Sequence, residues 1–558
     1  MILMLINNID NLNNAVRDVF VEYGLDSEVN FLYSQYPDRS DIQCNELLKH
    51  KDLDSLNSLI NKLKENLLKL EEVSGCEIEK DLFINITLSN NYLEEIINQW
   101  SFDSENFSKS LQDQKSKKVL IDYGGPNIGK ALHVGHLRSL SIGRSLYKMN
   151  ILVGNSVVSD IHLGDWGMPV AYMIALIEKE KIDLDNIEYV ELEEIYPRSV
   201  KYAEEDKGFY EEAKRVALEL NKENEDYLQY WNKISSISIQ YIKETLETID
   251  HSFDMWKGES TVNNLISPMV EGLIENKKVI ENDGAKVANL NIDPPILIEK
   301  SDGSSLYMTT DLATILEREK EGFDEVIYVV DNRQKNHFKQ LFQCVDYFNF
   351  SKARLVHVGF GTINGEDGKP LKTRDGDVYK LDKLFNDISE KLSTKETPEE
   401  SVNKLINNIL TFSDLVSNRN TDYKFDIEKF TDTNGKTAIY LDYTYARVTK
   451  VCQDLLQLNR EKDKYKDILI TNTIERDLII TALKFKYYLD MSIFNNDPHH
   501  LANYTYDLAR KINVLYEDEK LSELPWEEAS PKLALLKVSL LILKTGMESL
   551  GITPVGKI

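Results

Sequence analysis

The chain has 558 residues, of which 42% are hydrophobic and 28% are charged, which is enough for roughly three or four domains of ordinary globular composition. No apolar run approaches the roughly 18 residues that cross a bilayer, and Met1 to Ile6 lacks a basic flank, so the sequence predicts neither an anchor nor a signal peptide and favours a cytoplasmic location. The formal net charge of −27 weighs against a nucleic-acid partner without excluding one, because phosphate binding needs only a local basic surface.

Residues 1–115 form the first predicted domain, a small α+β module. Val16, Val19 and Phe20 have helical spacing, and the apolar run from Leu82 to Leu88 is typical of a strand. The polar stretch of residues 106–118 predicts a linker to the next domain.

Residues 117–149 predict a strand, a glycine-rich turn and a helix. The apolar run at 119–121 is bounded by turn residues, as expected of a buried strand. Glycines, a proline and an asparagine between 124 and 129 interrupt regular structure, and helical periodicity begins at about Val134.

The second predicted domain spans residues 116–395 and has a Rossmann-like parallel sheet, because strand-like and helix-like runs alternate along it. A charged helical region at about 183–285 is predicted as an insertion. The strand candidates after the first are residues 157–159, 286–292, 296–299, 325–330 and 354–358.

Residues 396–558 show helical periodicity without a strand signal and predict an all-α domain. Its tyrosines and basic residues could stack on and contact RNA bases, although packing between helices is the alternative for each tyrosine. The tyrosines are Tyr440, Tyr443, Tyr445, Tyr487, Tyr488, Tyr504 and Tyr506.

The loop that enters the predicted helix at Val134 carries His133, Gly135 and His136. A helix start offers unpaired backbone N–H groups and a positive dipole end to phosphate, and Gly135 lets a base or ribose lie close to the backbone. The two imidazoles can donate hydrogen bonds to phosphate oxygens, and Lys130 adds an ammonium. The pattern predicts a site for a nucleoside triphosphate; a solvent-exposed histidine pair beside an ordinary βα turn is the alternative, because such a short motif also occurs by chance.

Six sequence blocks together carry a resemblance to a known family. PNIGKALHVGH, residues 126–136, resembles the first signature of class I aminoacyl-tRNA synthetases, and of the arginyl-tRNA synthetases in particular. The other blocks follow in the order of that family: HLGDWG (162–167), FDMWKGES (253–260), LYMTTDLA (306–313), YVVDNRQKNHF (328–338) and HVGFGTINGEDGKPLKTRDGD (357–377). The resemblance extends to the N-terminal module, which is similar to the family's tRNA-contacting domain, and to YLDYTYARV (440–448) of its anticodon-binding domain.

The resemblance implies an arginine–tRNA ligase, which activates arginine with ATP and transfers it to tRNA, releasing AMP and pyrophosphate. Charge develops on the phosphate oxygens in the first step, so catalysis depends on positioning and electrostatic stabilisation. His133, Gly135, His136 and Lys130 are the implied ATP-binding residues.

The lysine loop departs from the class pattern Lys-Met-Ser-Lys-Ser. This chain has Lys369-Pro-Leu-Lys372-Thr-Arg instead, and the resemblance assigns Lys372 to the phosphates. It also implies that Lys130 supplies part of the missing positive charge. A surface turn with solvated charges is the alternative for residues 365–376.

A pocket for arginine needs carboxylates, because a guanidinium is planar, always charged and best held by paired acceptors. Glu259 and Asp311 are the candidates, and a lysine side chain would leave some of their acceptor positions unpaired. The resemblance implies that Tyr307 and Gln334 complete this pocket and that Asn127 holds the backbone end of the substrate. The alternatives are a helix N-cap for Asp311 and a solvated loop acid for Glu259.

The predicted ligands are ATP with Mg²⁺, arginine and its tRNA, and the predicted state is a monomer. No protein-bound structural metal is expected, because the four cysteines lack metal-ligand spacing. His162 and Asp165 of the second block receive no role from their spacing. Two other functions remain open: a non-catalytic RNA-binding relative, and an enzyme that adenylates a small molecule without tRNA.

Overall fold

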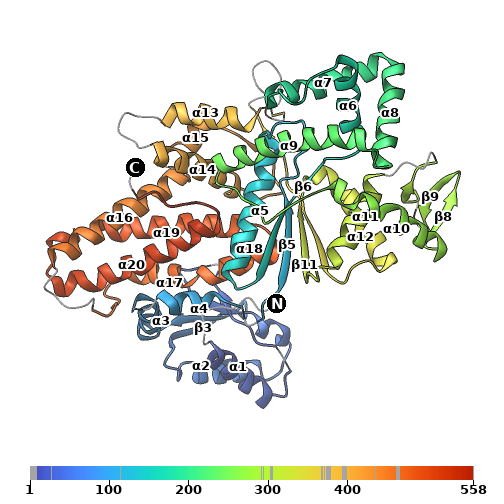
Figure 1. Ribbon diagram of the computed structural model, residues 1–558. Coiled ribbons are helices and arrows are strands. Elements are labelled where there is room, and N and C mark those ends of the chain that lie inside the picture. The colour runs from blue at the N-terminus through green and yellow to red at the C-terminus, as the bar shows by residue number, and fades with distance from the viewer. Residues whose placement is uncertain are drawn as a thin grey trace. The chain divides into compact units, whose positions relative to one another are not determined.

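The computed structural model describes residues 9–556 except 27, 35, 103, 114, 291, 293, 302–305, 366–367, 370, 372–378, 393–398, 434, 460–465 and 519. The chain forms two compact units, one of residues 114–429 and one of residues 1–113 with 430–558 (Figure 1). Among the described residues, no helix has the length and apolar character that crossing a membrane requires.

A five-stranded parallel sheet is the centre of the 114–429 unit (Figure 1). Its order is β12-β11-β5-β6-β7, and each neighbouring pair is parallel, so the predicted Rossmann-like sheet is confirmed. The chain runs from β5 outward to β7 and then returns to β11 on the other side, so the strand order reverses between β5 and β11, where such sheets bind ligands. The strands are β5 (Lys118–Tyr123), β6 (Ser156–Leu163), β7 (Met255–Gly258), β11 (Glu325–Val329) and β12 (Arg354–Val358).

Two of the predicted strands belong to a different sheet. β9 (Ala285–Ala288) pairs antiparallel with β8 (Val279–Asn282) and with β10 (Leu297–Glu299). Asp283 and Gly284 form a tight turn with positive φ between β8 and β9, and strands joined so closely pair antiparallel, because a parallel pair needs a long crossover. β7 was not predicted, since its four residues, three of them half-buried, form no apolar run.

Helices cover the parallel sheet and form the predicted insertion. α7, α8 and α9 pack with α6 around a buried cluster that includes Ile174, Leu192, Ala213 and Ile234 (Figure 1). The predicted inserted range also contains β7, which belongs to the parallel sheet. The helices of this unit are α5 (Val134–Leu152), α6 (Met168–Glu180), α7 (Tyr189–Glu205), α8 (Lys207–Asn221), α9 (Glu225–Thr248), α10 (Asn263–Glu275), α11 (Tyr307–Glu319), α12 (Lys335–Phe348), α13 (Leu381–Leu392) and α14 (Glu399–Leu415).

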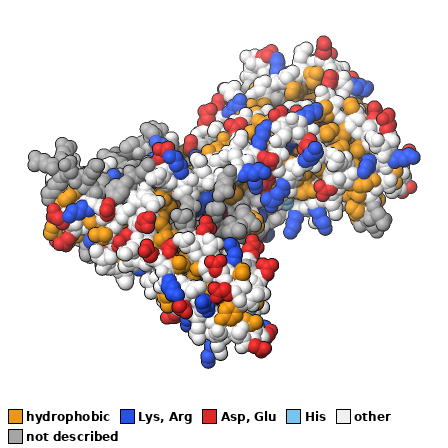
Figure 2. All heavy atoms as spheres, turned by 90° about the horizontal axis from the view of Figure 1, so that it is seen from below, with side chains coloured by type: hydrophobic (Ala, Val, Ile, Leu, Met, Phe, Trp, Pro, Cys, Tyr) orange, Lys and Arg blue, Asp and Glu red, His pale blue; other side chains and the backbone are white. Residues whose placement is uncertain are grey.

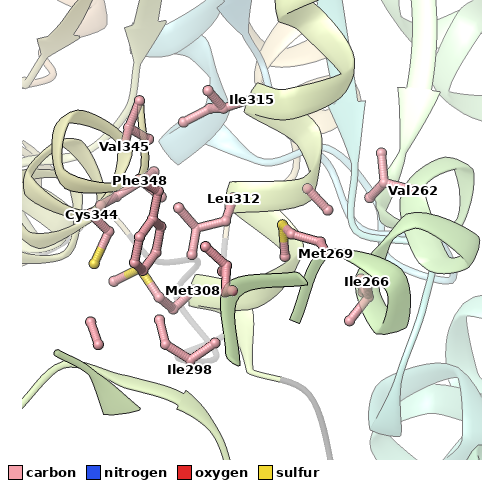
Figure 3. Packing of buried hydrophobic residues seen from close by; sticks show 14 of the residues in the cluster. Val262, Ile266, Met269, Ile298, Met308, Leu312, Ile315, Cys344, Val345 and Phe348 are labelled. Carbon is pink, nitrogen blue, oxygen red and sulfur yellow. The ribbon is translucent and has the colours of Figure 1, made fainter. Parts of the chain in front are cut away.

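The core beside α11 fixes the direction of two predicted pocket residues. Met308, Leu312 and Ile315 point from α11 into a buried cluster with side chains of α10, β10 and α12 (Figure 3). Tyr307 and Asp311 are four residues apart on the same helix and therefore share a different face of it. The apolar face of α11 thus orients the polar face that carries them.

A short strand pair lies near the end of the 114–429 unit. β13 (Ile363–Asn364) and β14 (Tyr423–Lys424) form a parallel pair, so the expectation that no strand follows residue 396 is wrong for β14. The remaining short helices of the chain are η1 (Glu46–His50), η2 (Glu259–Val262), η3 (Asn332–Gln334), α15 (Ile427–Phe430) and η4 (Leu521–Glu523).

The second unit confirms the predicted α+β module and all-α region and joins them in one compact body. Its antiparallel sheet has the order β1-β2-β4-β3. Arg476 of the C-terminal helices donates to both carboxylate oxygens of buried Asp41, at 3.0 and 2.7 Å. The elements are β1 (Leu32–Tyr33), β2 (Ile42–Cys44), β3 (Val73–Ile78), β4 (Ile84–Leu88), α1 (Asp10–Glu22), α2 (Leu56–Leu67), α3 (Asn90–Phe102), α4 (Ser104–Leu111), α16 (Ala438–Leu458), α17 (Thr473–Leu483), α18 (Phe485–Asn495), α19 (His499–Asp518) and α20 (Trp526–Ser549).

Two sequence expectations about this unit need correction or refinement. The predicted linker at 106–118 begins inside α4, where Phe107 and Leu111 are buried. Tyr504 is also buried and stacks on Tyr488 at 5.1 Å, which favours a packing role for both rings. Tyr443 is 50% exposed, so it remains accessible.

Candidate functional site

The predicted functional blocks gather at one edge of the parallel sheet. The segments with His133, Asp165 and Glu259 follow β5, β6 and β7, and the segment with Gln334 follows β11. Because the carboxyl ends of parallel strands meet at the same edge, segments distant in sequence come together there.

The two histidines lie at the start of α5, as predicted, and both also cap the helix, which was not predicted. His133 is the N-cap residue, and its Nδ1 accepts a hydrogen bond from the Gly135 amide at 3.0 Å. His136 Nδ1 accepts from the His133 amide, also at 3.0 Å, and the two rings lie 3.9 Å apart between centroids. A neutral imidazole that accepts at Nδ1 carries its proton on Nε2, so each ring presents Nε2–H as its donor.

A glycine is needed at position 135 because there is no room for a Cβ atom, and not because of its backbone conformation. A Cβ atom at this position would lie 2.8 Å from Cε1 and 2.9 Å from Nδ1 of His133. A side chain here would displace the His133 ring from its capping position.

The first amides of α5 are already paired, which corrects the expectation of unpaired N–H groups for phosphate. Val134 donates to the Tyr379 carbonyl at 2.9 Å, and His136 donates to the His133 carbonyl at 2.8 Å. The Gly135 amide is taken by the His133 ring. The donors that this helix start offers to a phosphate are therefore the two imidazole Nε2–H groups.

Both imidazoles are neutral near pH 7. Burial, with a smaller contribution from His133, lowers the pKa of His136 to about 3. Burial also lowers the pKa of His133, and the nearby charges of Lys130 and Arg333 lower it further. The pair can donate hydrogen bonds but adds no positive charge, so the charge that a triphosphate needs has to come from other groups.

A cavity of about 520 Å³ opens beside the histidine pair, between the ends of β5 and β11. Such a volume suits a small-molecule site. Five predicted site residues line it: Asn127, His133, Gly135, His136 and Gln334. Arg333 lines it too and was not predicted; its guanidinium pairs with Asp331 at 2.9 and 3.0 Å.

Glu259, Asp311 and Tyr307 form a second, acidic group on η2 and α11. Burial, with smaller contributions from the negative charges of Asp311 and Asp165, raises the pKa of Glu259 to about 8. Glu259 is half-buried in the short helix η2, which disfavours the alternative of a freely solvated loop acid. The N-cap alternative for Asp311 is wrong, because α11 begins at Tyr307 and Asp311 lies within the helix.

His337 was missed as a partner of the acidic group. Its Nε2 lies 2.5 Å from Oδ2 of Asp311, which leaves Oδ1 of the same carboxylate for another donor. His337 lies in the fifth sequence block and in the first turn of α12. This place was the only feature of the sequence that could have indicated a contact with Asp311.

Asp165 has a structural role that its spacing could not reveal. Its carboxylate accepts from the Ser260 amide at 2.9 Å and from Ser260 Oγ at 2.6 Å. A Cβ on Gly258 would lie 2.5 Å from that carboxylate, so glycine is needed there. Asp165 thereby holds the turn that carries Glu259.

Among the described residues, Asp122, Asp160 and His162 form a group that could be considered as a metal site, because their possible metal-ligand atoms all lie within 4.8 Å of one another. Arg318 Nη2 donates to Asp122 at 2.7 Å and to Asp160 at 2.6 Å. A guanidinium thus already neutralises the two carboxylates, and the group is better described as a buried ion pair than as a metal site.

Lys130 lies beside the histidines, with its Nζ 4.0 Å from the ring centroid of Tyr196. Lys372 lies outside the described residues. The ends of its loop are paired: Leu371 donates to the Ile363 carbonyl at 3.0 Å, and Leu381 donates to the Leu132 carbonyl at 3.0 Å. The chain therefore leaves from β13 and returns next to His133.

Comparisons with known proteins cover almost the whole chain. Residues 101–427 match the family described as tRNA synthetases class I (R), catalytic domain, and residues 441–558 match the DALR anticodon binding domain. The chain is 33% identical to an arginine–tRNA ligase of Alkaliphilus oremlandii over 98% of both chains, and 33% identical to one of Francisella tularensis over 98% of this chain and 99% of the other. Its fold is similar to the crystal structure of arginyl-tRNA synthetase from Plasmodium falciparum, with a TM-score of 0.81, 24% identity and 100% coverage of both chains. By these matches, the chain belongs to the arginyl-tRNA synthetase family of class I tRNA synthetases.

Proposed function

We propose that this chain is an arginine–tRNA ligase whose chemistry takes place at the carboxyl edge of the parallel sheet. The observation that carries this proposal is a half-buried acidic pair. Glu259 follows β7 at the same sheet edge as His133 and His136, and the charge of Asp311 acts on it. An acidic group suits a cationic amino acid, and hydrogen-bond donors for phosphate suit a triphosphate, so the two together suit both substrates.

In the first step, the carboxylate of arginine attacks the α-phosphorus of ATP and pyrophosphate leaves. His133 and His136 donate from Nε2 to phosphate oxygens, and Lys130 adds positive charge as negative charge spreads onto them. Lys372 is proposed to join Lys130 at the phosphates. The ATP enters with Mg²⁺, which offsets further phosphate charge. Asn127 and Gln334, both in the wall of the cavity, orient the backbone end and the side chain of arginine.

Recognition of arginine uses the acidic group on α11 and η2. His337 occupies Oδ2 of Asp311, so Oδ1 faces the guanidinium, and Glu259 and Tyr307 complete the contacts. In the second step, a terminal ribose hydroxyl of the tRNA attacks the carbonyl of the adenylate, which gives arginyl-tRNA and AMP.

The expected partners of the protein are arginine and its tRNA, and the expected state is a monomer. The match to an anticodon binding domain at 441–558 supports a tRNA partner, and basic side chains lie in local groups among acidic ones in Figure 2, despite the net charge of −27. All described site residues belong to one unit of one chain, so a monomer suffices. The four cysteines are buried and unpaired, which fits the reducing cytoplasm. We propose 1–115, 116–395 and 396–558 as the functional domains, with α14 of the last one packed on the catalytic unit.

Charging of total tRNA separates this function from its two rivals. The wild-type chain is expected to attach arginine and not lysine to tRNA, and to catalyse exchange between pyrophosphate and ATP strongly only when tRNA is present. Binding of tRNA without any charging would favour a non-catalytic relative. Strong exchange without tRNA, together with no charging, would favour a small-molecule adenylating enzyme.

Arginine affinity is expected to rise with pH and to level off above about pH 8. Glu259 is mostly protonated at pH 7 in the free protein, because burial and its acidic neighbours raise its pKa to about 8. A bound guanidinium favours the ionised form, so binding releases a proton, and the dissociation constant falls by roughly eightfold between pH 7.0 and 8.5. Calorimetry in buffers of different ionisation enthalpy measures both quantities.

The Glu259→Gln variant is the control for this pH effect. It should bind arginine more weakly and lose the dependence on pH in this range. An unchanged pH dependence in this variant would show that another group releases the proton.

A further inference from the structure

Helix α7 of the insertion contacts both cations that flank His133. The ring centroid of Tyr196 lies 4.0 Å from the ammonium of Lys130, and Glu193 Oε2 lies 2.7 Å from the ammonium of Lys380. Lys130 precedes His133 by three residues, and Lys380 pairs with His133 in an isolated β-bridge. The insertion is therefore part of the surroundings of the phosphate side of the site.

The two contacts differ in what they do to the charge. The carboxylate of Glu193 neutralises Lys380, whereas the aromatic ring of Tyr196 attracts the Lys130 ammonium through its quadrupole and leaves the full positive charge in place. No carboxylate lies within ion-pair distance of Lys130 in the part of the chain that the structure describes. An ammonium held in this way is restricted in position and still able to act on phosphate.

Tyr196 is itself held in place by its helix. Leu192, Ile195 and Ser199, on the same face of α7, are buried, and Tyr196 packs against the cluster that α7 shares with α6, α8 and α9. Ser199 Oγ donates to the Tyr196 carbonyl at 2.7 Å. The Tyr196 side chain is therefore partly buried against this cluster.

Tyr196 also lies near the arginine side of the site. Burial and the charge of Glu259 raise the pKa of Tyr307, and the proximity of Tyr196 raises it further. Tyr196 therefore contacts Lys130 and also lies close enough to Tyr307 to influence its pKa.

We propose that Tyr196 is a positioning residue that holds the ammonium of Lys130 beside the phosphates of ATP. This inference rests on the proposed function and on the role given there to Lys130. A lysine side chain has many rotamers, and a ring that favours one of them reduces the loss of freedom on reaching the transition state. The proposal gives the insertion a part in arginine activation.

The test compares ring removal with ring retention at one position. Tyr196→Leu is expected to lower kcat of arginine activation by about tenfold, while Tyr196→Phe, which keeps the aromatic face, stays within about twofold of wild type. The KM for arginine should change little in either variant. Tyr196→Met replaces Tyr196→Leu if the latter does not fold, as judged by thermal unfolding.

A matched control is available on the same helix. The ring of Tyr202 lies 5.2 Å from the ammonium of Lys179, and neither residue lines the cavity or belongs to the proposed site. Tyr202→Leu therefore removes a similar contact and should leave kcat unchanged. An equal loss in Tyr202→Leu and Tyr196→Leu would show that both act only through the packing of α7 and would overturn the proposal.

A double-variant cycle separates this inference from the proposed function. When Lys130 is already alanine, Tyr196→Leu should cost no further activity, because the ring then has nothing to position. A full additional loss in that background would overturn the inference. Normal activity of Lys130→Ala alone would instead remove the role of Lys130 in the proposed function, on which the inference depends.

Discussion

Lys130→Ala is expected to lower the rate of arginine activation by about two to three orders of magnitude at saturating arginine, ATP and tRNA. The histidine pair is neutral near pH 7 because burial lowers both imidazole pKa values, so it donates hydrogen bonds without charge. The lysine loop also lacks the full class pattern. Lys130 is left as a principal source of positive charge for the leaving pyrophosphate, and single-turnover formation of AMP measures its contribution.

Two further variants make this prediction specific to position and charge. Lys130→Arg keeps a cation and should retain a larger share of the rate than alanine. Lys179→Ala removes an ammonium that also lies over aromatic rings, 5.2 Å from Tyr202 and 5.6 Å from Phe209, and should act as wild type. Near-normal activation by a folded Lys130→Ala variant would contradict the assignment.

Asp311→Asn is expected to raise the KM for arginine by roughly 10- to 100-fold, with the KM for ATP within about twofold of wild type. The change keeps the shape of the side chain and an acceptor for His337, which lies 2.5 Å from Oδ2. It removes the negative charge that pairs with the guanidinium. Charging rates over a range of each substrate give the two KM values.

Glu317→Gln is the matched control, because it is the same kind of change on the same helix. Glu317 pairs with Lys257 at 3.1 Å and has no part in the proposed pocket, so both KM values should stay near wild type. If Asp311→Asn weakened the use of ATP as much as that of arginine, Asp311 would be a structural residue of α11 and not a specificity residue.

The local features of the site could be predicted from the sequence. The strand β5, the break at Gly124 and Gly125 and the start of α5 at Val134 follow from apolar periodicity and turn residues, and the structure confirms them. The partners of the α5 amides could not be predicted in the same way. One of them, the Tyr379 carbonyl, comes from the far end of the lysine loop, and no spacing near His133 indicates it.

Contacts between distant segments explain most of the differences. Arg318 joins Asp122 and Asp160 across three segments of the chain, and α7 reaches Lys130 from the insertion. Local periodicity predicts which face of a helix is apolar, but it does not predict against which distant segment that face packs. β7 was missed for a related reason, since its place in the sheet depends on pairing with β6 and not on its own residues.

The domain bounds illustrate the same limit. Composition predicts a change of character near residues 115 and 396, whereas the compact units divide after 113 and after 429. Arg138 of α5 is 1% exposed and pairs with buried Asp414 of α14 at 2.9 Å, so the first C-terminal helix packs with the catalytic unit. A helical pattern alone cannot show that a helix belongs to the domain before it.

The central claim is that the site has two separable parts, a phosphate side at Lys130 and an arginine side at Asp311. Single-turnover AMP formation, measured as arginine is raised at saturating ATP and tRNA, tests this most directly in wild type, Lys130→Ala and Asp311→Asn. We predict that a high arginine concentration restores most of the rate to Asp311→Asn and none to Lys130→Ala. The same response of both variants to arginine would contradict the claim.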